Sequence, residues 1–284
     1  MNKVVILTDS TCDLDLNIIQ EKNINVIPLY VCFGDKNYKD GVDINTEKLY
    51  EMVEELGYLP KTSAVSPNEF INFFAPFIDK GYDIVYLGIG STLSSTFNNA
   101  YIASLSFPEN RIFLIDSLNL STGTGLLVLK ACKYRDQNFS AAEIQKKVTE
   151  LVPRVHSQFS VKKLDFLHKG GRCSGTKKFF GTMLRIRPII RVKQGVLLLD
   201  DKVYGRFEKA LDLMIKDLND HKDDLDEDVV MVTHSLGDEE CKYIMERIPE
   251  DIKKRVHLLE THAGCVISSH CGRKTIGILY ITNH

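Results

Sequence analysis

The sequence predicts an α/β protein of two α/β domains, the first with a mostly parallel sheet covered by helices and the second with a mixed sheet and helices. Three observations lead to this prediction. The chain has 284 residues, which is enough for two domains. Short β-branched runs alternate with helical segments over its first half. After about residue 155 the pattern changes and strand-like runs become more frequent.

The elements of the first half follow from their residue patterns. The run VVIL at residues 4–7 is apolar and β-branched, so it predicts a buried parallel strand. Ser66, Pro67 and Glu69 predict a helix start with a capping serine, a proline in the first turn and a capping box. Further strands are expected at residues 24–33, 82–90 and 111–117, and helices at 45–56, 66–78, 93–105, 123–136 and 140–153.

The second half is expected to hold most of the remaining strands. They are predicted at residues 157–161, 188–192, 195–203, 228–234, 255–261 and 275–281, with helices at 206–221 and 238–248. The short acidic segment 220–228 predicts a solvated connection between a helix and a strand. We therefore expect an N-terminal α/β domain at residues 1–157 and a C-terminal α/β domain at residues 158–284.

Composition and charge narrow the class of protein. A formal net charge of −2 gives no overall attraction to nucleic acid or to a membrane surface. The seven cysteines form no CxxC pair, which is typical of reduced thiols in the cytoplasm. The apolar runs are too short for a signal peptide or a membrane span. We expect a cytoplasmic protein with no stable membrane insertion and no nucleic-acid partner.

Polar residues follow three expected strands of the first half, at positions 8–10, 90–91 and 116–117. In open parallel sheets, ligands bind beyond the carboxyl ends of the strands, so these positions are candidates for a binding rim. Thr62 and Ser63 precede an expected helix and are candidates for the same rim. Helix capping is the alternative role for these hydroxyls, and both roles are compatible at a helix start.

The segment GSTLSST at residues 90–96 concentrates hydroxyl groups between an expected strand and an expected helix. It lacks the third glycine of a dinucleotide-binding fingerprint and the Lys-Ser/Thr of a P-loop. It also contains no GxSxG nucleophile elbow. Hydroxyls at a helix start without a recognisable base indicate that the segment holds an anion rather than attacks an acyl group. The hydroxyl residues are Ser91, Thr92, Ser94, Ser95 and Thr96.

Two features of the second half concern positive charge. Arg172 follows two glycines, in an expected flexible loop where its guanidinium either pairs with a carboxylate or stays at the surface. Residues 162–193 carry ten lysines and arginines against one acid, Asp165. This stretch predicts either a solvated face or a docking patch for an acidic or phosphate-bearing partner.

The segment THAGCVISSHCG at residues 261–272 combines histidines with cysteines. Its His262, Cys265, His270 and Cys271 fit no standard zinc spacing, so we expect no metal. The segment is expected to form a loop followed by a strand. His270 would then follow that strand, with either a site role or a place in the core or at the surface.

Five short motifs resemble those of the DegV family in order and spacing: VILTDSTCDL, KTSAVSP, GSTLSSTFNNA, FLHKGGRCSG and GCVISSHCG. The resemblance covers essentially the whole chain. It implies a bacterial cytoplasmic protein that binds a long-chain fatty acid, such as palmitate, in a buried pocket. It also implies a partner, the catalytic subunit of a fatty acid kinase, to which the carboxylate is presented for acyl-phosphate formation.

The resemblance further implies which residues bind the carboxylate. Thr62 in KTS matches the family's carboxylate-binding threonine, and Ser94 in LSST matches its serine. His270 matches the family's histidine, and Arg172 matches the arginine of its glycine-glycine-arginine motif. The expected ligand-binding residues are Thr62, Ser63, Ser94, Ser95, Arg172 and His270, with no catalytic residue, metal or cofactor.

The chain departs from the family pattern at two places. Ser95 replaces a usual glycine and adds a hydroxyl beside the expected carboxylate site. Arg273 and Lys274 replace the usual Pro-Gly after His270, which adds positive charge to that loop.

Two other functions remain open from the residues themselves. One is an enzyme, a small-molecule phosphotransferase or acyl hydrolase acting at the same interdomain site. It would need a base or a metal-binding carboxylate there, and Asp9 and Asp116 are the nearby candidates. The other is a regulatory interaction module that docks through residues 162–193.

Overall fold

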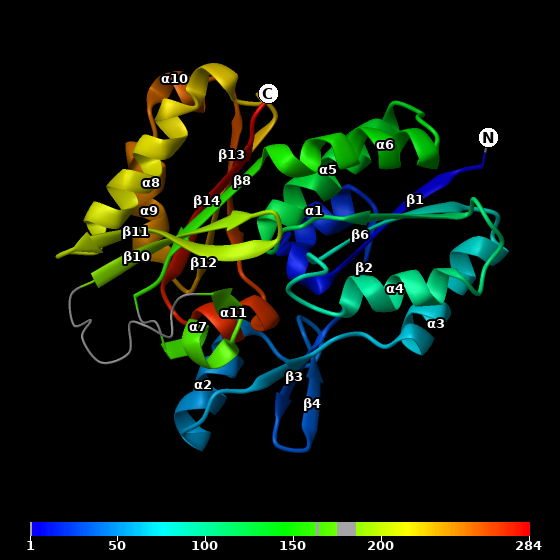
Figure 1. The fold of residues 1–284 in the computed structure, drawn as a ribbon, viewed down its shortest axis with the longest axis horizontal. Helices are drawn as coiled ribbons and strands as arrows, with labels where there is room; N and C mark the ends of the chain where they lie inside the picture. Colours follow the sequence, from blue (N-terminus) through cyan, green and yellow to red (C-terminus); the bar gives the residue numbers. More distant parts are fainter. Residues whose placement is uncertain (1, 163–164, 175–185) are drawn as a thin grey trace.

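The computed structural model describes residues 2–162, 165–174 and 186–284, and it arranges them in three β-sheets flanked by helices (Figure 1). The predicted alternation of strands and helices is confirmed in the first half, and the mixed second sheet is confirmed in the second. Residues 163–164 and 175–185 of the basic stretch lie outside the described residues.

The first half is built on a parallel sheet with strand order β2-β1-β6-β7. One face packs against α5 and α6, and the other packs against α3 and α4. Both faces are therefore covered, which is why the strands are nearly uniformly apolar. The elements are β1 (Val4–Asp9), β2 (Ile24–Ile27), β6 (Asp83–Gly88), β7 (Ile112–Asp116), α3 (Pro67–Asp79), α4 (Thr96–Ser104), α5 (Thr122–Asp136) and α6 (Ala141–Leu151).

Residues 24–33 form two strands rather than the single predicted one. β2 ends at Ile27, and the next strand, β3, belongs to a separate antiparallel sheet with order β4-β3-β5. Pro28 has no N–H to continue a ladder, and the N–H of Leu29 donates to Ser10 Oγ at 3.1 Å instead. The small sheet consists of β3 (Tyr30–Phe33), β4 (Lys36–Lys39) and β5 (Lys61–Ser63), with α2 (Thr46–Leu56) between β4 and β5.

The second half is built on a mixed sheet in which the described strands have the order β13-β12-β14-β8-β10-β11-β9. α8 and α9 cover one face, and α5 approaches the other from the first half. The elements are β8 (Val155–Ser160), β9 (Cys173–Ser174), β10 (Ile186–Lys193), β11 (Val196–Tyr204), β12 (Val229–Ser235), β13 (His257–His262), β14 (Thr275–Ile281), α8 (Glu208–Asp220), α9 (Asp238–Arg247) and α10 (Glu250–Lys253).

Two short helices, α7 (Asp165–Gly170) and α11 (Cys265–Cys271), contradict the predicted loops and strand at these places. The prediction of a strand was based on the apolar run before His270, which includes Val266 and Ile267. Both lie within α11, where Val266 is buried and the hydroxyl of Ser269 donates to the carbonyl of Cys265 at 2.7 Å. Packing between the two halves therefore outweighs the local β propensity.

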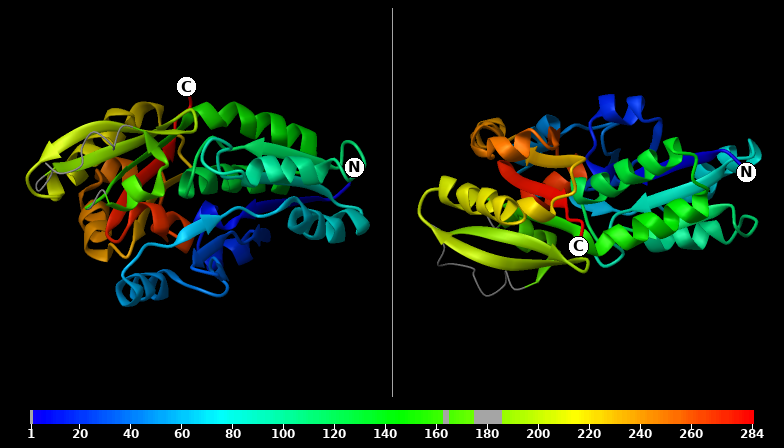
Figure 2. Two further views of the ribbon diagram at one scale, coloured as in Figure 1. Left: turned by 60° about the horizontal axis from the view of Figure 1, so that its bottom comes forward. Right: turned by 90° about the horizontal axis from the view of Figure 1, so that it is seen from above.

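The connection between the halves runs from α6 through a 3₁₀ turn (Val152–Arg154) directly into β8. The predicted boundary at residues 157/158 falls inside β8, and the division into two domains stays a prediction. The N-terminus lies at the outer end of the first half, whereas the C-terminus lies near the junction (Figure 2). Within the described ranges, no helix combines the length and the apolar character that a membrane crossing requires. The remaining elements are α1 (Leu16–Glu21) and the 3₁₀ turns Ser10–Cys12 and Lys222–Asp224.

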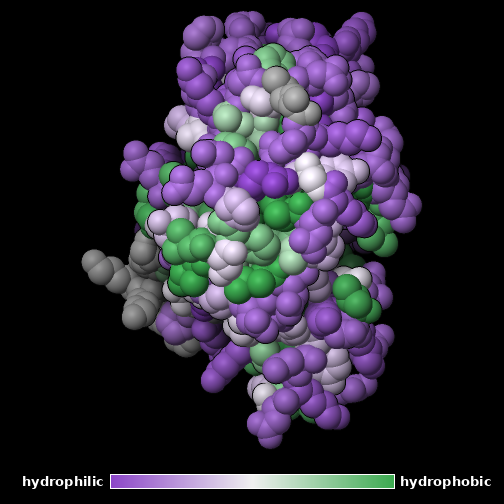
Figure 3. All heavy atoms as spheres, turned by 90° about the vertical axis from the view of Figure 1, so that its right-hand side faces the viewer, coloured by the Kyte–Doolittle hydropathy of each residue, from purple (hydrophilic) through white to green (hydrophobic). Residues whose placement is uncertain are grey.

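α4 is apolar on its outer face as well as its inner one. Ala100 and Ala103 are buried, whereas Tyr101, Ile102 and Leu105 are 55%, 52% and 67% exposed. Figure 3 shows hydrophobic residues gathered on this end of the molecule, where the far ends of α3 and α4 lie. The periodicity of α4 therefore does not indicate which of its faces is buried.

The capping box predicted at the start of α3 is confirmed. Ser66 Oγ accepts the N–H of Glu69 at 3.3 Å, and Glu69 Oε2 accepts the N–H of Ser66 at 2.9 Å. This start directs the chain from β5 into α3 beside the cavity described below.

We expect Ser66→Ala to lower the free energy of unfolding by about 1 kcal/mol, because the N–H of Glu69 loses its acceptor. Urea denaturation followed by circular dichroism measures this change. Ser106→Ala, in the turn after α4, is the control and is expected to have a much smaller effect. Equal stability of wild type and Ser66→Ala would contradict the prediction.

Candidate functional site

A cavity of about 460 Å³ lies between the two halves of the molecule. Its walls come from both: the loops after β2, β6 and β7 together with β5, and then β8, β12, β14, α7 and α11. This volume is in the range of small-molecule sites. Apolar side chains make up much of the wall, among them Leu29, Ile89, Leu93, Leu120, Phe159, Leu167, Val192, Leu197, Ile267 and Leu279.

All six residues predicted to bind a ligand line this cavity. Three of them, Ser63, Ser95 and Arg172, are exposed, so the cavity reaches the surface where they lie. The structure thus brings together residues that are more than 200 positions apart in the sequence. That these residues contact a ligand stays a prediction. The six are Thr62 and Ser63 of β5, Ser94 and Ser95 before α4, Arg172 after α7, and His270 at the end of α11.

Thr62 and His270 form the central contact of this polar end. Thr62 Oγ1 lies 2.8 Å from Nε2 of His270. Burial, together with the charge of Arg172, lowers the pKa of His270 to about 4. The imidazole is therefore neutral at physiological pH, and it joins β5 of the first half to α11 of the second.

The start of α4 supplies further donors. Ser94 Oγ lies 2.9 Å from the hydroxyl of Thr96 and accepts the N–H of Thr96 at 3.3 Å. Ser95 occupies the N-cap position of α4, but its side chain makes no capping hydrogen bond. The first N–H groups of a helix have no partner within the helix and favour negative charge. Ser95 therefore adds a free hydroxyl to an end of α4 that is suited to an anion.

Arg172 is placed by the turn that ends α7. Its Nη1 donates to the carbonyl of Gly170 at 2.8 Å, and Gly171 before it has φ +68°, which favours glycine. The predicted flexible loop is thus a helix end followed by a tight turn. The guanidinium lies on the exposed side of the cavity, where its charge acts on His270.

The polar side chains deeper in the cavity are bonded to other parts of the protein. Ser157 Oγ donates to Asn119 Oδ1 at 2.8 Å, and Ser121 Oγ donates to Asp13 at 2.5 Å. Ser235 Oγ lies within hydrogen-bond distance of two further hydroxyls. The other such bonds join Gln158 to Met214, Thr233 to Thr122 and Thr261, and Thr275 to Cys271. These hydroxyls are already used by the protein, so the inner wall offers little to a polar ligand.

Of the predicted binding rim, Thr62 and Ser63 line the cavity, whereas positions 8–10, 90–91 and 116–117 are not among its lining residues. Asp9 is buried and accepts from the N–H groups of Thr11 and Ile89. Asp116 accepts from the N–H groups of Ser91 and Leu118, at 3.1 and 3.0 Å. These carboxylates hold loops in place, so neither is positioned as a base for the alternative enzymatic function.

The sequence did not indicate two buried carboxylates, Asp13 and Asp40, that hold α11. Asp13 accepts the N–H of Gly264 at 2.9 Å, and Asp40 accepts those of Cys265 and Val266 at 2.7 and 3.3 Å. Burial raises the pKa of both carboxyls. The only sequence signal was that Asp13 lies in the motif VILTDSTCDL, which says nothing of its partner on α11.

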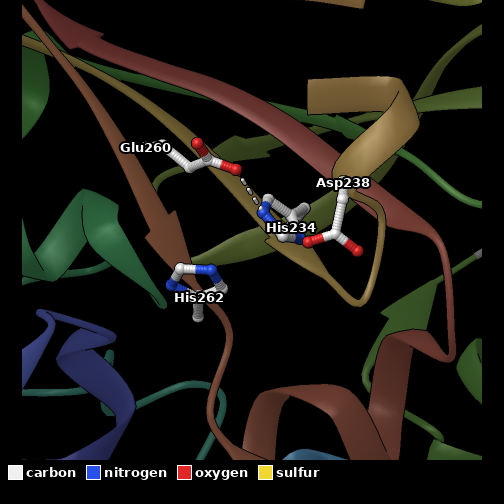
Figure 4. A group of neighbouring side chains, drawn as sticks. All are labelled: His234, Asp238, Glu260 and His262. Carbon is white, nitrogen blue, oxygen red and sulfur yellow. Dashed lines mark hydrogen bonds and ion pairs between the residues drawn. The ribbon is translucent and has the colours of Figure 1, made fainter. Parts of the chain in front are cut away.

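A group of metal-ligating residue types lies where β12 and β13 end, with Asp238 at the start of α9 (Figure 4). His234 Nε2 lies 3.0 Å from Glu260 Oε1, and His234 Nδ1 accepts the N–H of Gly237 at 3.0 Å. The accepting Nδ1 places the ring proton on Nε2, so no lone pair of His234 faces Glu260, Asp238 or His262. This geometry does not fit a cation. Among the residues weighed for zinc in the sequence, Cys265 Sγ donates to the carbonyl of Ile44, His270 faces Thr62 and His262 faces Asp15.

The geometry defines an α/β protein with a largely apolar cavity between its halves and a group of polar side chains at one end of that cavity. A profile described as "uncharacterised protein, DegV family" matches residues 3–283. The chain belongs to the DegV family.

Relatives and solved structures agree with this assignment. A DegV domain-containing protein of Clostridium acetobutylicum is 36% identical over 286 residues, covering both chains completely. A DegV family protein from Thermus thermophilus, described for its fatty acid binding, has a TM-score of 0.87 and 26% identity, covering 99% of this chain and 100% of its own. A stearic acid-binding protein from Eubacterium ventriosum has a TM-score of 0.85 and 26% identity, covering 100% of this chain and 99% of its own.

We expect the ring of His270 to titrate at about pH 4 in the ligand-free protein, because burial and Arg172 disfavour its charged form. The unfolded chain binds the proton near pH 6.5, so this residue lowers the stability as the pH falls from about 6.5 to 4. NMR of the histidine ring protons measures each midpoint separately. His262, whose pKa is raised chiefly by its hydrogen bond to Asp15, is the internal control. A midpoint of 6.5 or higher for His270 would contradict the prediction.

Proposed function

We propose that the protein binds a long-chain fatty acid, with the acyl chain inside the cavity and the carboxylate at Thr62, Ser94 and Ser95. One observation supports this most directly. The hydroxyls along the inner wall are bonded within the protein, whereas at the end near the surface the hydroxyl of Ser95 makes no capping hydrogen bond although it stands at the start of α4. Such a division suits a ligand that is apolar over most of its length and anionic at one end.

The energies are consistent with this ligand. Burying about fifteen methylenes contributes roughly 12 kcal/mol at about 0.8 kcal/mol each. Ordering the chain and losing free motion offset a sizeable part of this gain. The acyl chain therefore supplies affinity, and the hydroxyls need only orient the carboxylate and replace its lost water. Palmitate and stearate have acyl chains of about this length.

The carboxylate would be held by hydroxyl donors rather than by a buried ion pair. Thr62, Ser94 and Ser95 are close to the surface end, with Ser63 beside them. Neutral His270 supports Thr62, and the positive charge of Arg172 balances the anion from the exposed side. Several donors converging on one carboxylate are needed because an unpaired buried charge is costly.

We further propose that the protein is a carrier that presents this carboxylate to a separate fatty acid kinase subunit, which forms the acyl phosphate. Arg172, Ser63 and Ser95 are exposed, which would let a partner reach the carboxylate. Among the described residues at the polar end, none is placed as a general base, because His270 has a low pKa and Asp9 and Asp116 are bonded elsewhere. Solved structures described as fatty-acid-binding support the lipid-binding part of this role.

We expect Thr62→Ala combined with Ser94→Ala to reduce the amount of co-purified fatty acid several-fold, because the carboxylate loses two donors. Native mass spectrometry of the purified protein measures the bound lipid. Ser104→Ala combined with Thr149→Ala removes two hydroxyls far from the cavity and is the matched control. A full complement of lipid in the Thr62/Ser94 variant would place the carboxylate elsewhere.

We expect acyl phosphate to form only when the loaded protein, ATP and a fatty acid kinase catalytic subunit are combined. Trapping with hydroxylamine, followed by mass spectrometry of the hydroxamate, detects the product. The protein alone serves as the control. Turnover of ATP or of acyl esters by the protein alone would instead favour the alternative of a phosphotransferase or acyl hydrolase.

A further inference from the structure

The two glycines before Arg172 are required for different physical reasons. A Cβ on Gly171 would meet nothing within 4 Å, so space does not require glycine there. Its φ of +68° lies in the left-handed region, and this backbone conformation favours glycine. Gly170 has an ordinary φ, but a Cβ on it would lie 2.4 Å from Nδ1 of His270. No real Cβ contact is that short, so space requires glycine at 170. The end of α7 thus lies directly against the imidazole ring.

The hydrogen-bond partners of the two ring nitrogens indicate where the proton of the neutral ring lies. Nδ1 of His270 is buried and has no hydrogen-bond partner among the described residues. A buried N–H without an acceptor is rarer in proteins than an unused acceptor. The proton therefore belongs on Nε2, which faces Thr62 Oγ1 at 2.8 Å. With Nε2–H donating to this oxygen, the hydroxyl proton of Thr62 is left to donate elsewhere.

We propose that Gly170 is a positioning residue: by letting α7 lie against the ring of His270, it keeps Nε2–H directed at Thr62 and so keeps the Thr62 hydroxyl as a donor to the ligand. This inference rests on the proposed function for the ligand itself. A second glycine makes a related contact, because a Cβ on Gly272 would lie 2.8 Å from the ring of Phe166 on α7. Gly272 therefore sets the distance between α7 and α11, and Gly170 sets the orientation of the ring between them.

The tautomer is read directly by long-range ¹H–¹⁵N correlation of the histidine rings. In the wild-type protein we expect the Nε2–H form for His270. In Gly170→Ala the added methyl displaces the ring, and we expect a different tautomer or a mixture. Lys169→Ala, on the exposed side of α7, is the control and is expected to keep the wild-type spectrum. An Nδ1–H ring in the wild type, or an unchanged ring in Gly170→Ala, would overturn the proposal.

The consequence for binding is measured as the release rate of palmitate from the loaded protein into phosphatidylcholine vesicles. We expect Gly170→Ala to release palmitate about tenfold faster, which is the scale of losing one hydrogen bond to a charged group. In the background of Thr62→Val, Gly170→Ala should have no further effect, since it acts through that hydroxyl. An equal acceleration in both backgrounds would mean a merely structural role and would overturn the proposal.

Two results separate this inference from the proposed function. Wild-type protein that retains no palmitate contradicts the function, while the ring spectra still decide whether Gly170 sets the tautomer. Wild-type protein that retains palmitate, with Gly170→Ala releasing it at the same rate, contradicts the inference alone. If Gly170→Ala fails to fold, Gly170→Ala with His270→Ala removes the clash. Recovery of folding in that double variant supports the contact, and failure to recover overturns it.

Discussion

The cavity depends on the anchoring of α11 by two buried carboxylates. This helix has seven residues, too few to be stable alone, and its first N–H groups are bonded by Asp13 and Asp40 of the first half. His270 lies at the opposite end of the same helix. The first half therefore fixes both ends of α11, through the two carboxylates at its start and through Thr62 at its end. A histidine of the second half is thereby held beside hydroxyls of the first.

The chemical character of the cavity comes from how its hydroxyls are shared with the rest of the protein. Many residues of its wall are serines and threonines, yet those inside are bonded to carbonyls, amides or other hydroxyls. A wall of this kind presents methyl and methylene groups to the cavity and needs no water. At the surface end, Ser95 caps nothing, and the imidazole of His270 leaves Thr62 a proton to donate. The two ends of the cavity therefore differ in what their serines and threonines are bonded to, and not in residue type.

Some predictions from the sequence were wrong for identifiable reasons. The segment of α11 was expected to include a strand because an apolar run precedes His270, but anchoring and burial between the halves make it a helix. Residues 24–33 were expected to be one strand, and Pro28 divides them between two sheets. The polar strand ends were expected to form a binding rim, but the carboxylates of Asp9 and Asp116 are bonded to N–H groups of their own loops and of the loop after β6. The errors at α11 and at the rim concern partners that folding brings from elsewhere in the sequence, whereas the division at Pro28 has a local cause.

The sequence alone determined the alternation of strands and helices, the capping box of α3 and the set of residues that line the polar end, because these follow from local periodicity, local hydrogen bonds and short motifs. Only the tertiary structure decided which hydroxyls are left to a ligand and how His270 is oriented. The physical reason is that a side chain's hydrogen bonds and burial depend on residues that are brought beside it by folding. Thr62 and His270 are 208 positions apart, and no local pattern records that distance.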